Sequence, residues 1–310
     1  MCCAEFSSFI ALINRFCSLQ PPEQLSELNI DGRHMKHIEI GASSSSGTFH
    51  LHEDSTKLSE KDVSSDQKVR APPSYLYRFL EWIGTKMTKL EKLALRNFNT
   101  LQSLPINFGE LKKLTYLNLS GCTNLTQLPK FFSQLLQLQY LILRDCGKLS
   151  IPLDILGEIS TLEYIDFKGC VSLVHLPLAV ASQRSLRYLN LVDTGVVKME
   201  LELPKNLEHL RIGNPCLKEV FLSVNGWTKL KELILFGCRN LKSINAPIEK
   251  FTQLERLLIY KSAVHIVPEG VAALEYIKSL VIEGCPVRNF SFKIRHESYL
   301  ANYSTRKLRF

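Results

Sequence analysis

The chain has 310 residues, of which 45% are hydrophobic and 22% are charged. This composition is ordinary for a folded protein, and it excludes wholesale disorder and a collagen-like fibre. No uninterrupted apolar run approaches the roughly 20 residues that a membrane-spanning helix needs, so we expect no transmembrane segment. The sequence has nine cysteines and a formal charge of +8. The spacing of the cysteines has to decide whether they form disulfides or metal sites, and the position of the charge has to decide whether the chain binds nucleic acid.

The first part of the chain holds one irregular unit and a polar stretch. Residues 1–24 form an N-terminal segment that lacks the basic start of a secretory signal peptide. Residues 25–40 carry the spacing L-x-x-L-x-I, which we interpret as a first, degenerate repeat. Residues 41–74 are rich in serine and in mixed charges, so we expect a disordered loop or linker there. The sequence leaves open whether the first unit stacks directly on the later ones.

Residues 75–285 repeat a leucine pattern, and a fixed period takes precedence over any division of the chain by length. The triplet L-x-x-L-x-L recurs at steps of 21 to 24 residues, and all twenty-seven triplet positions are aliphatic or phenylalanine. The triplets begin at Leu90, Leu114, Leu138, Leu162, Leu186, Leu207, Leu230, Leu254 and Ile277. Alternate side chains of such a segment lie on one face of a short strand, and one unit cannot bury that face alone.

The period therefore predicts an α/β fold of the leucine-rich repeat type, a curved, horseshoe-shaped solenoid. We expect a parallel β-sheet on its concave face, and short helices or irregular turns on its convex face. Residues 286–310 follow as a basic C-terminal cap or tail, with six basic residues and one acidic residue. Alternating apolar residues at its start, from Phe290 to Ile294, predict an edge strand. Because more than half of the net charge lies in this tail rather than along the sheet, we expect no nucleic-acid binding.

Five of the nine cysteines occupy one column, eight residues after the start of a triplet. They are Cys122, Cys146, Cys170, Cys238 and Cys285, and threonine or serine stands in the same column of two other units. Serine and threonine can replace the hydrogen bond of a free thiol, but they cannot replace a disulfide. We therefore interpret the five as structural, reduced thiols rather than a disulfide ladder, which indicates a cytosolic or nuclear compartment. No cysteine spacing fits a metal site, and we expect neither a metal nor a cofactor.

The side chains between the triplet leucines are expected to face solvent on the concave side, where two patches of candidate partner-binding residues occur. The first patch is a ladder of tyrosines with three charged residues, and the second is apolar. Their members are Tyr116, Tyr140, Tyr164, Tyr188, Arg144, Asp166 and Lys168 in the first, and Ile234, Phe236, Leu258 and Tyr260 in the second. Tyrosine and arginine dominate binding hot spots, and contiguous exposed apolar surface marks interaction sites. Two alternatives stay open: the tyrosines only stabilise the sheet, or the apolar patch docks another domain.

Two units, Leu114 to Pro129 and Leu162 to Pro177, read L-x-x-L-x-L-x-x-C-x-x-L-x-x-L-P. They resemble the leucine-rich repeats of plant intracellular disease-resistance proteins. The resemblance implies a role in plant innate immunity, with a pathogen effector, a guarded host protein or a nucleotide-binding domain in trans as the partner. The phosphate loop of that family does not occur in these 310 residues, so we expect a truncated receptor, a decoy, a helper subunit or a fragment.

No dinucleotide fingerprint, nucleophile elbow or zinc-protease motif occurs in the sequence either. We therefore expect a non-enzymatic module that binds a protein. The alternative is a cytosolic signalling scaffold similar to the Ras-binding leucine-rich repeat proteins, and a secreted receptor ectodomain ranks third.

Overall fold

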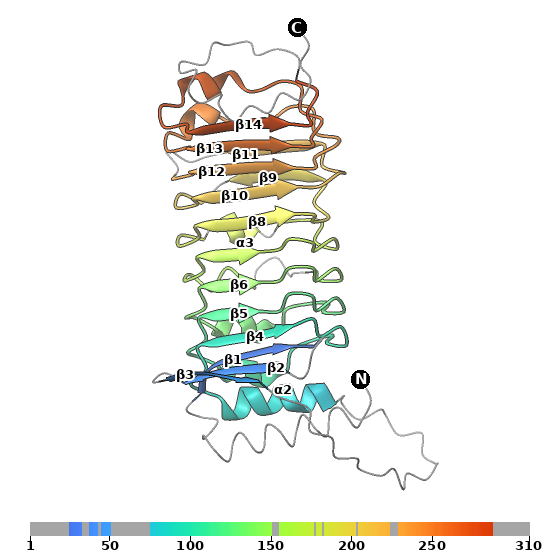
Figure 1. The fold of residues 1–310 in the computed structure, drawn as a ribbon, viewed down its shortest axis with the longest axis vertical. Coiled ribbons are helices and arrows are strands. Elements are labelled where there is room, and N and C mark those ends of the chain that lie inside the picture. The colour runs from blue at the N-terminus through green and yellow to red at the C-terminus, as the bar shows by residue number, and fades with distance from the viewer. Residues whose placement is uncertain are drawn as a thin grey trace, which may run out of the picture.

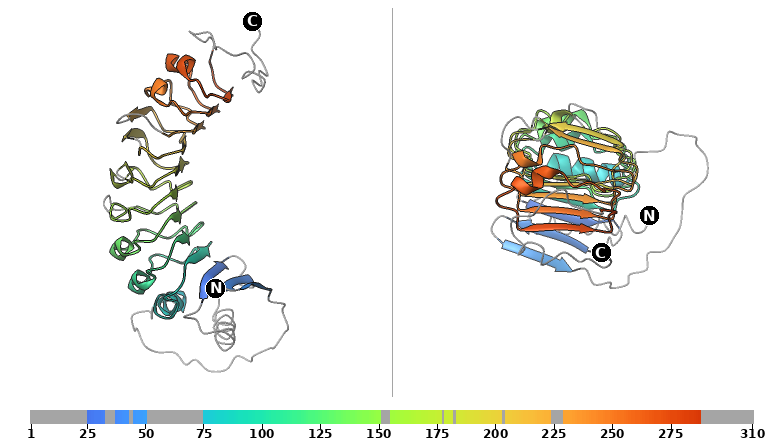
Figure 2. Two further views of the ribbon diagram at one scale, coloured as in Figure 1. Left: turned by 90° about the vertical axis from the view of Figure 1, so that its left-hand side faces the viewer. Right: turned by 90° about the horizontal axis from the view of Figure 1, so that it is seen from above.

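The computed structural model describes residues 25–32, 37–42, 45–50, 75–150, 155–176, 178–181, 183–202, 204–223 and 229–287. The chain forms one elongated stack of repeats, and each repeat contributes one strand to a long sheet (Figure 1). The stack bends toward the side of the sheet, so the sheet lines the concave surface (Figure 2). The solenoid fold predicted from the leucine period is thereby confirmed.

Ten strands in the described part of the chain run parallel in this sheet, and nine of them coincide with the nine predicted triplets. In spatial order they are β1 (Leu25–Asp31), β4 (Lys92–Arg96), β5 (Tyr116–Asn118), β6 (Tyr140–Ile142), β7 (Tyr164–Asp166), β8 (Tyr188–Val192), β10 (His209–Gly213), β12 (Glu232–Phe236), β13 (Arg256–Tyr260) and β14 (Ser279–Glu283). Equivalent positions of successive repeats pair without a shift of register from β1 to β14. Each column read from the sequence is therefore a straight row across the sheet.

The N-terminal end of the sheet settles how the first unit is placed. β1 pairs in parallel with β4, so the degenerate repeat stacks directly on the regular ones. Beyond β1 the sheet continues antiparallel through β2 (His37–Ala42) and β3 (Ser45–His50). The structure differs here from the expected disordered loop over residues 41–74, because a hairpin satisfies the backbone groups that β1 would otherwise leave unpaired at its outer edge. Residues 51–74 lie outside the described residues, as do residues 1–24 and the predicted strand in the C-terminal tail.

The hydrophobic core is the aliphatic layer directly behind the sheet. All three side chains of the triplet that starts at Leu114 are fully buried, and the other triplets are buried as well except that Ile282 of the last one is partly exposed. The chain returns along the convex side mainly through short helices: η2 (Ile106–Glu110), η3 (Lys130–Gln134), α3 (Leu178–Ala181), η4 (Ile248–Lys250) and η5 (Glu269–Ala273). In the sequence a proline precedes each of the five, because the fixed φ of proline suits the start of a helix and its missing N–H is not needed there.

Two further elements depart from the simple repeat. The helix α2 (Tyr75–Lys86) covers the N-terminal end of the core, where Phe79, Leu80 and Ile83 are buried, and it packs on η2. A second, two-stranded parallel sheet lies on the convex side, formed by β9 (Lys198–Glu202) and β11 (Glu219–Ser223). The sequence analysis did not predict this sheet, although Val220 and Leu222 of β11 alternate with exposed residues as a strand requires.

Candidate partner-binding face

The four predicted tyrosines form one continuous row on the concave face, at the start of strands β5, β6, β7 and β8. The rings of Tyr164 and Tyr188 stack in parallel, with centroids 4.1 Å apart and an angle of 3° between their planes. The other neighbouring pairs are tilted, with centroids 5.9 to 6.2 Å apart. The row continues onto the imidazole of His209, 6.2 Å from the ring of Tyr188. Tyr140 is 39% exposed and the other three tyrosines are half-buried, so the row is partly accessible to solvent.

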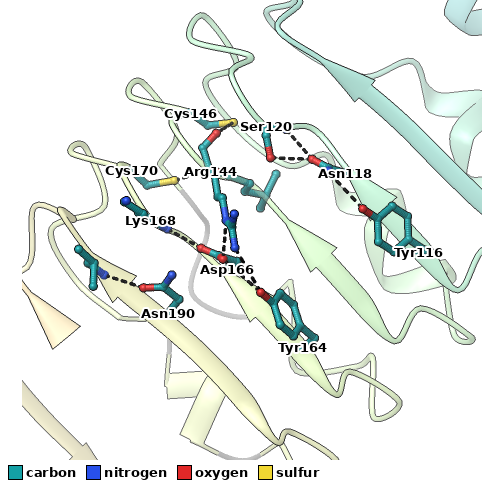
Figure 3. Close-up of polar contacts among 12 residues, drawn as sticks. Tyr116, Asn118, Ser120, Arg144, Cys146, Tyr164, Asp166, Lys168, Cys170 and Asn190 are labelled. Carbon is teal, nitrogen blue, oxygen red and sulfur yellow. Dashed lines mark hydrogen bonds and ion pairs between the residues drawn. The ribbon is translucent and has the colours of Figure 1, made fainter. Parts of the chain in front are cut away.

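Asp166 does not face solvent as the sequence predicted, because its side chain is completely buried. Its carboxylate accepts a hydrogen bond from Nε of Arg144 at 2.6 Å and one from the backbone N–H of Lys168 at 3.0 Å (Figure 3). The hydroxyl of Tyr164 lies 3.4 Å both from this carboxylate and from Nη2 of Arg144. Asp166 is therefore an anchor that fixes Arg144, and the side chains that remain accessible to a partner are those of Arg144 and Lys168.

The row between the second and third leucines has a structural role at three polar positions, on β5, β7 and β8. Asn118, Asp166 and Asn190 each accept the backbone N–H two residues further along, at 2.9, 3.0 and 3.2 Å (Figure 3). Short polar side chains make this local bond readily. In these three repeats the bond lies at the end of the strand, just before the chain turns away from the sheet.

A second charged cluster, which the sequence analysis did not single out, surrounds Glu232 on β12. The carboxylate is buried, and it accepts hydrogen bonds from Nη2 of Arg211, at 3.2 Å, and from Nη2 of Arg256. Nδ1 of His209 lies 3.6 Å from the same carboxylate. The guanidinium of Arg211 also lies over the ring of Tyr188, 5.5 Å from its centroid, so this cluster continues the tyrosine row. The available signal was the opposite charge at one column of neighbouring repeats, Glu232 beside Arg256.

Burial controls the protonation of two groups on this face. Burial is the main cause that raises the pKa of Tyr164 far above its usual value, supported by its hydrogen bond with Tyr188 and by the nearby Asp166. Burial is also the main cause that lowers the pKa of His209. Glu208 favours the charged imidazole, but the cations around His209, Arg256 first, disfavour it. At neutral pH both groups are therefore uncharged, and the arginines carry the charge of this part of the face.

The four apolar candidates lie together at the C-terminal end of the same face. Ile234 pairs with Leu258, and Phe236 pairs with Tyr260, on the adjacent strands β12 and β13. Phe236 is 40% exposed and the other three side chains are half-buried. The ammonium of Lys261 lies 5.9 Å from the ring centroid of Phe236. The structure thus brings these residues into one patch beside Arg256.

The cysteine column lies at the bend where each repeat leaves the sheet. The thiols of Cys122, Cys146 and Cys170 are buried and donate to the carbonyl of the last triplet residue in the preceding repeat, at 3.0 to 3.2 Å. Burial raises the pKa of Cys122 to about 11 and that of Cys170 to about 12. Cys238 and Cys285 are also free thiols whose pKa burial raises, and Thr194 supplies a hydroxyl donor to a backbone carbonyl in the same column.

Two searches of the described residues gave negative results. No group of three or more histidine, cysteine, aspartate or glutamate side chains there is arranged to hold a metal ion. No helix in the same part of the chain is long and apolar enough to cross a membrane.

No protein-family model matches the sequence, and no curated protein matches it. Solved structures resemble the fold at low sequence identity. The leucine-rich repeat domain of the type III effector XopL is 22% identical, over 67% of this chain and 73% of that domain, with a TM-score of 0.49. Internalin C2 from Listeria monocytogenes is 15% identical, over 71% and 80% of the two chains, with a TM-score of 0.42.

A plant protein is among the similar structures as well. The leucine-rich repeat ectodomain of the receptor kinase GASSHO1/SCHENGEN3 from Arabidopsis thaliana, solved in complex with CASPARIAN STRIP INTEGRITY FACTOR 2, is 18% identical, with a TM-score of 0.37. The match covers 68% of this chain but only 31% of that ectodomain. These likenesses concern the fold alone. The ten parallel strands in register and the repeated leucine core identify the fold of the chain as a leucine-rich repeat solenoid.

Proposed function

We propose that this chain is a non-enzymatic recognition module of plant innate immunity that binds a protein partner through its concave face. The single observation that carries the proposal is the row of aromatic side chains in register from β5 to β10, with the guanidinium of Arg211 over the ring of Tyr188. Such side chains bury a large area and keep a polar tip, which is why they dominate binding hot spots. The partner classes are a pathogen effector, a guarded host protein or a nucleotide-binding domain in trans.

The charged contacts of the face support a binding role over a purely structural one. Arg144 is held by Asp166, and Arg211 and Arg256 are held by Glu232. A side chain that is already fixed loses little conformational entropy when a partner binds, so a preorganised surface binds more tightly. The tyrosine rings stack on one another in the same way before any partner arrives.

The assignment to plant immunity and to a cytosolic or nuclear compartment rests on the repeat sequence. The cysteine column and the Leu-Pro turns carry the resemblance to plant disease-resistance repeats, and the thiols of Cys122, Cys146 and Cys170 donate to backbone carbonyls in the bend. Free thiols at regular positions suit a reducing compartment.

The test is direct binding of the purified chain to purified candidates by biolayer interferometry. The first candidate is the nucleotide-binding domain of a plant disease-resistance receptor, and the second is a small GTPase loaded with a non-hydrolysable GTP analogue. The double variant Tyr140→Ala/Tyr164→Ala should lose at least about tenfold in affinity for the first candidate while keeping its circular dichroism spectrum. The matched control is Tyr276→Ala, because Tyr276 is exposed in the turn before β14, away from the concave row.

Unchanged affinity of the double variant would contradict binding through the concave face. Binding of the GTP-loaded GTPase alone would replace the immune assignment by the scaffold alternative.

A further inference from the structure

On the concave face, two negatively charged side chains are buried and the positively charged side chains that pair with them are exposed. The carboxylates of Asp166 and Glu232 are 0% and 2% exposed, whereas the side chains of Arg144, Arg211 and Arg256 are 45%, 39% and 51% exposed. Lys168 is exposed as well, and within the described residues its ammonium makes no hydrogen bond or ion pair. Each negative charge therefore lies under the positive charge that it holds, and a partner meets the positive side.

The arginines keep unused donors despite their internal partners. Among the described residues, Arg144 donates through Nε and Nη2, which leaves the N–H groups of Nη1 free. Arg211 donates to Glu232 through Nη2, and its Nε is buried without a hydrogen-bond partner there. A guanidinium has five N–H donors and pairs with a carboxylate through two of them. A carboxylate from a partner can therefore join each guanidinium without displacing the buried one.

The strand order sets the distance between these positions. Arg144 lies two residues after the end of β6 and Arg211 lies on β10, and three strand-to-strand steps separate these repeats through β7 and β8. At about 4.8 Å per step, the distance across the strands is about 14 Å. It becomes about 16 Å when the offset along the strand direction is included, because Arg144 and Arg211 stand in neighbouring columns. An extended chain advances about 3.4 Å per residue, so it covers that distance in four or five residues.

The apolar patch lies directly beyond Arg211 on the next strands. Phe236 is on β12 and Leu258 is on β13, one and two steps further along. A chain that crosses the arginines in this direction reaches the patch within about three more residues. Both surfaces are thus within reach of one segment of about ten residues.

We propose that the concave face binds an extended acidic segment of its partner, in which two carboxylates four or five residues apart pair with Arg144 and Arg211 and apolar residues follow onto Phe236 and Leu258. This inference rests on the proposed function, because it names the class of partner for the same face. Each buried carboxylate balances only one of the two positive side chains beside it, Arg144 and Lys168 at Asp166 and Arg211 and Arg256 at Glu232, so a basic or uncharged segment would leave one positive charge at each site without a counter-charge.

The test is selection of binders from a random 12-residue peptide library displayed on phage, followed by fluorescence anisotropy with the synthesised peptides. We expect an enriched pair of acidic residues four or five apart, followed by apolar residues. Replacement of both acidic residues by glutamine in the peptide should weaken binding at least about tenfold, and this measurement does not depend on any protein variant folding.

Protein variants test the same contacts from the other side. Lys168→Gln and Arg211→Gln should each weaken binding several-fold, because each removes a positive charge from the face. Both variants should keep the fold, since Lys168→Gln breaks no internal contact and Arg211→Gln leaves Glu232 paired with Arg256. The control Lys130→Gln/Lys250→Gln removes two positive charges on η3 and η4, outside the concave face, and should change little.

The possible failures are distinguishable. A neutral or basic consensus, equal binding of the glutamine peptide, or no enrichment over bare support would overturn the acidic-segment proposal. A single-stranded RNA oligonucleotide that binds in place of the peptide would overturn it too. If selected binders of any charge ignore Tyr140→Ala/Tyr164→Ala, the concave face is not the binding site, and the proposed function fails with it.

Discussion

At the scale of single residues, the bend between sheet and convex side depends on one backbone position before the cysteine column. This position has positive φ in eight repeats, and it is occupied by Asn97, Gly121, Asp145, Gly169, Asp193, Gly237, Lys261 and Gly284. Glycine, asparagine and aspartate are the residues that adopt this conformation most readily. In the first five repeats glycine alternates with a short polar residue, whose side chain fills the space next to the neighbouring glycine. A Cβ on Gly169, for example, would lie 2.3 Å from Oδ1 of Asp145.

The first prediction compares two glycines of this column. Gly169 has φ +78°, and an added Cβ would also lie 3.1 Å from Cα of Asp145, whereas Gly237 has φ +69° and no atom within 4 Å of its added Cβ. Gly237→Ala should therefore cost about 1 kcal/mol, from the backbone conformation alone. Gly169→Ala should cost about 2 kcal/mol more, because it adds a steric clash. Urea denaturation measures both, and equal losses would show that the neighbouring side chain does not matter.

The second prediction concerns the thiols. Because burial raises the pKa of Cys122 to about 11 and of Cys170 to about 12, both stay protonated and inaccessible at pH 8. Cys216 is exposed. Iodoacetamide at pH 8 should therefore label Cys216 in the folded chain and leave Cys122 and Cys170 unlabelled, as read by peptide mass spectrometry. A sample unfolded in guanidinium is the control, since all three should then be labelled. Rapid labelling of Cys170 in the folded chain would refute its placement in the core.

At the scale of elements, strands β8 to β13 carry a network in which charges from four repeats meet. Lys231 donates to Glu208 at 2.7 Å, and Arg187 lies 3.5 Å from the same carboxylate. Glu208 therefore has a lowered pKa, mainly through its hydrogen bond with Lys231. Burial first, and then the nearby cations Arg256, Arg211 and Lys231, lower the pKa of His209 against the opposing effect of Glu208.

The third prediction follows from His209. Its pKa in the folded chain lies below the usual value, first because it is partly buried, and so the unfolded chain takes up the proton at a higher pH. The contribution of His209 to stability is complete above pH 6.5 and is lost as the pH falls below that value toward its folded pKa. His209→Gln should therefore show a smaller loss of unfolding free energy between pH 7 and pH 5 than the parent chain. Parallel urea titrations at the two pH values test this, and identical pH dependence would contradict it.

At the scale of the whole molecule, the main contacts between elements of the described residues join neighbouring repeats along the stack. Stability in such a stack is approximately a sum of repeat and interface terms, so local damage stays local. β1 is paired on its two edges with β2 and β4 near the N-terminal end of the sheet, whereas β8 lies in the middle of the sheet. The two ends of the solenoid are then energetically almost independent.

The fourth prediction tests this independence with two core substitutions. Leu28 on β1 and Leu189 on β8 are buried to within 1%, and replacement by alanine should cost about 2 to 5 kcal/mol at either site. Leu28→Ala should increase hydrogen exchange in β1 and β4 and leave β12 to β14 unchanged. Leu189→Ala should increase exchange on both sides of β8. Exchange mass spectrometry resolves the strands, and a uniform rise over the whole chain after Leu28→Ala would argue for one cooperative unit instead.

The solenoid, its nine regular strands and their register followed from the sequence, because burial of alternate leucines is a local pattern repeated at a fixed period. The tyrosine row followed for the same reason, since a residue at one column stays at that column in every repeat. The strands β9 and β11 could not be predicted from the sequence, because they pair with each other on the convex side, where the leucine triplet gives no information.

The charged part of the face was decided by the tertiary structure. The sequence placed Asp166 at a solvent-facing column, but the guanidinium of Arg144 reaches across from the adjacent strand and covers it. Glu232 is likewise buried by Arg211 and Arg256, which lie 21 residues before it and 24 residues after it. Such contacts depend on side-chain length and on how closely the curved sheet brings its strands together. The sequence alone thus determined where each side chain starts on the sheet, and only the assembled solenoid decided which charges are buried and which remain for a partner.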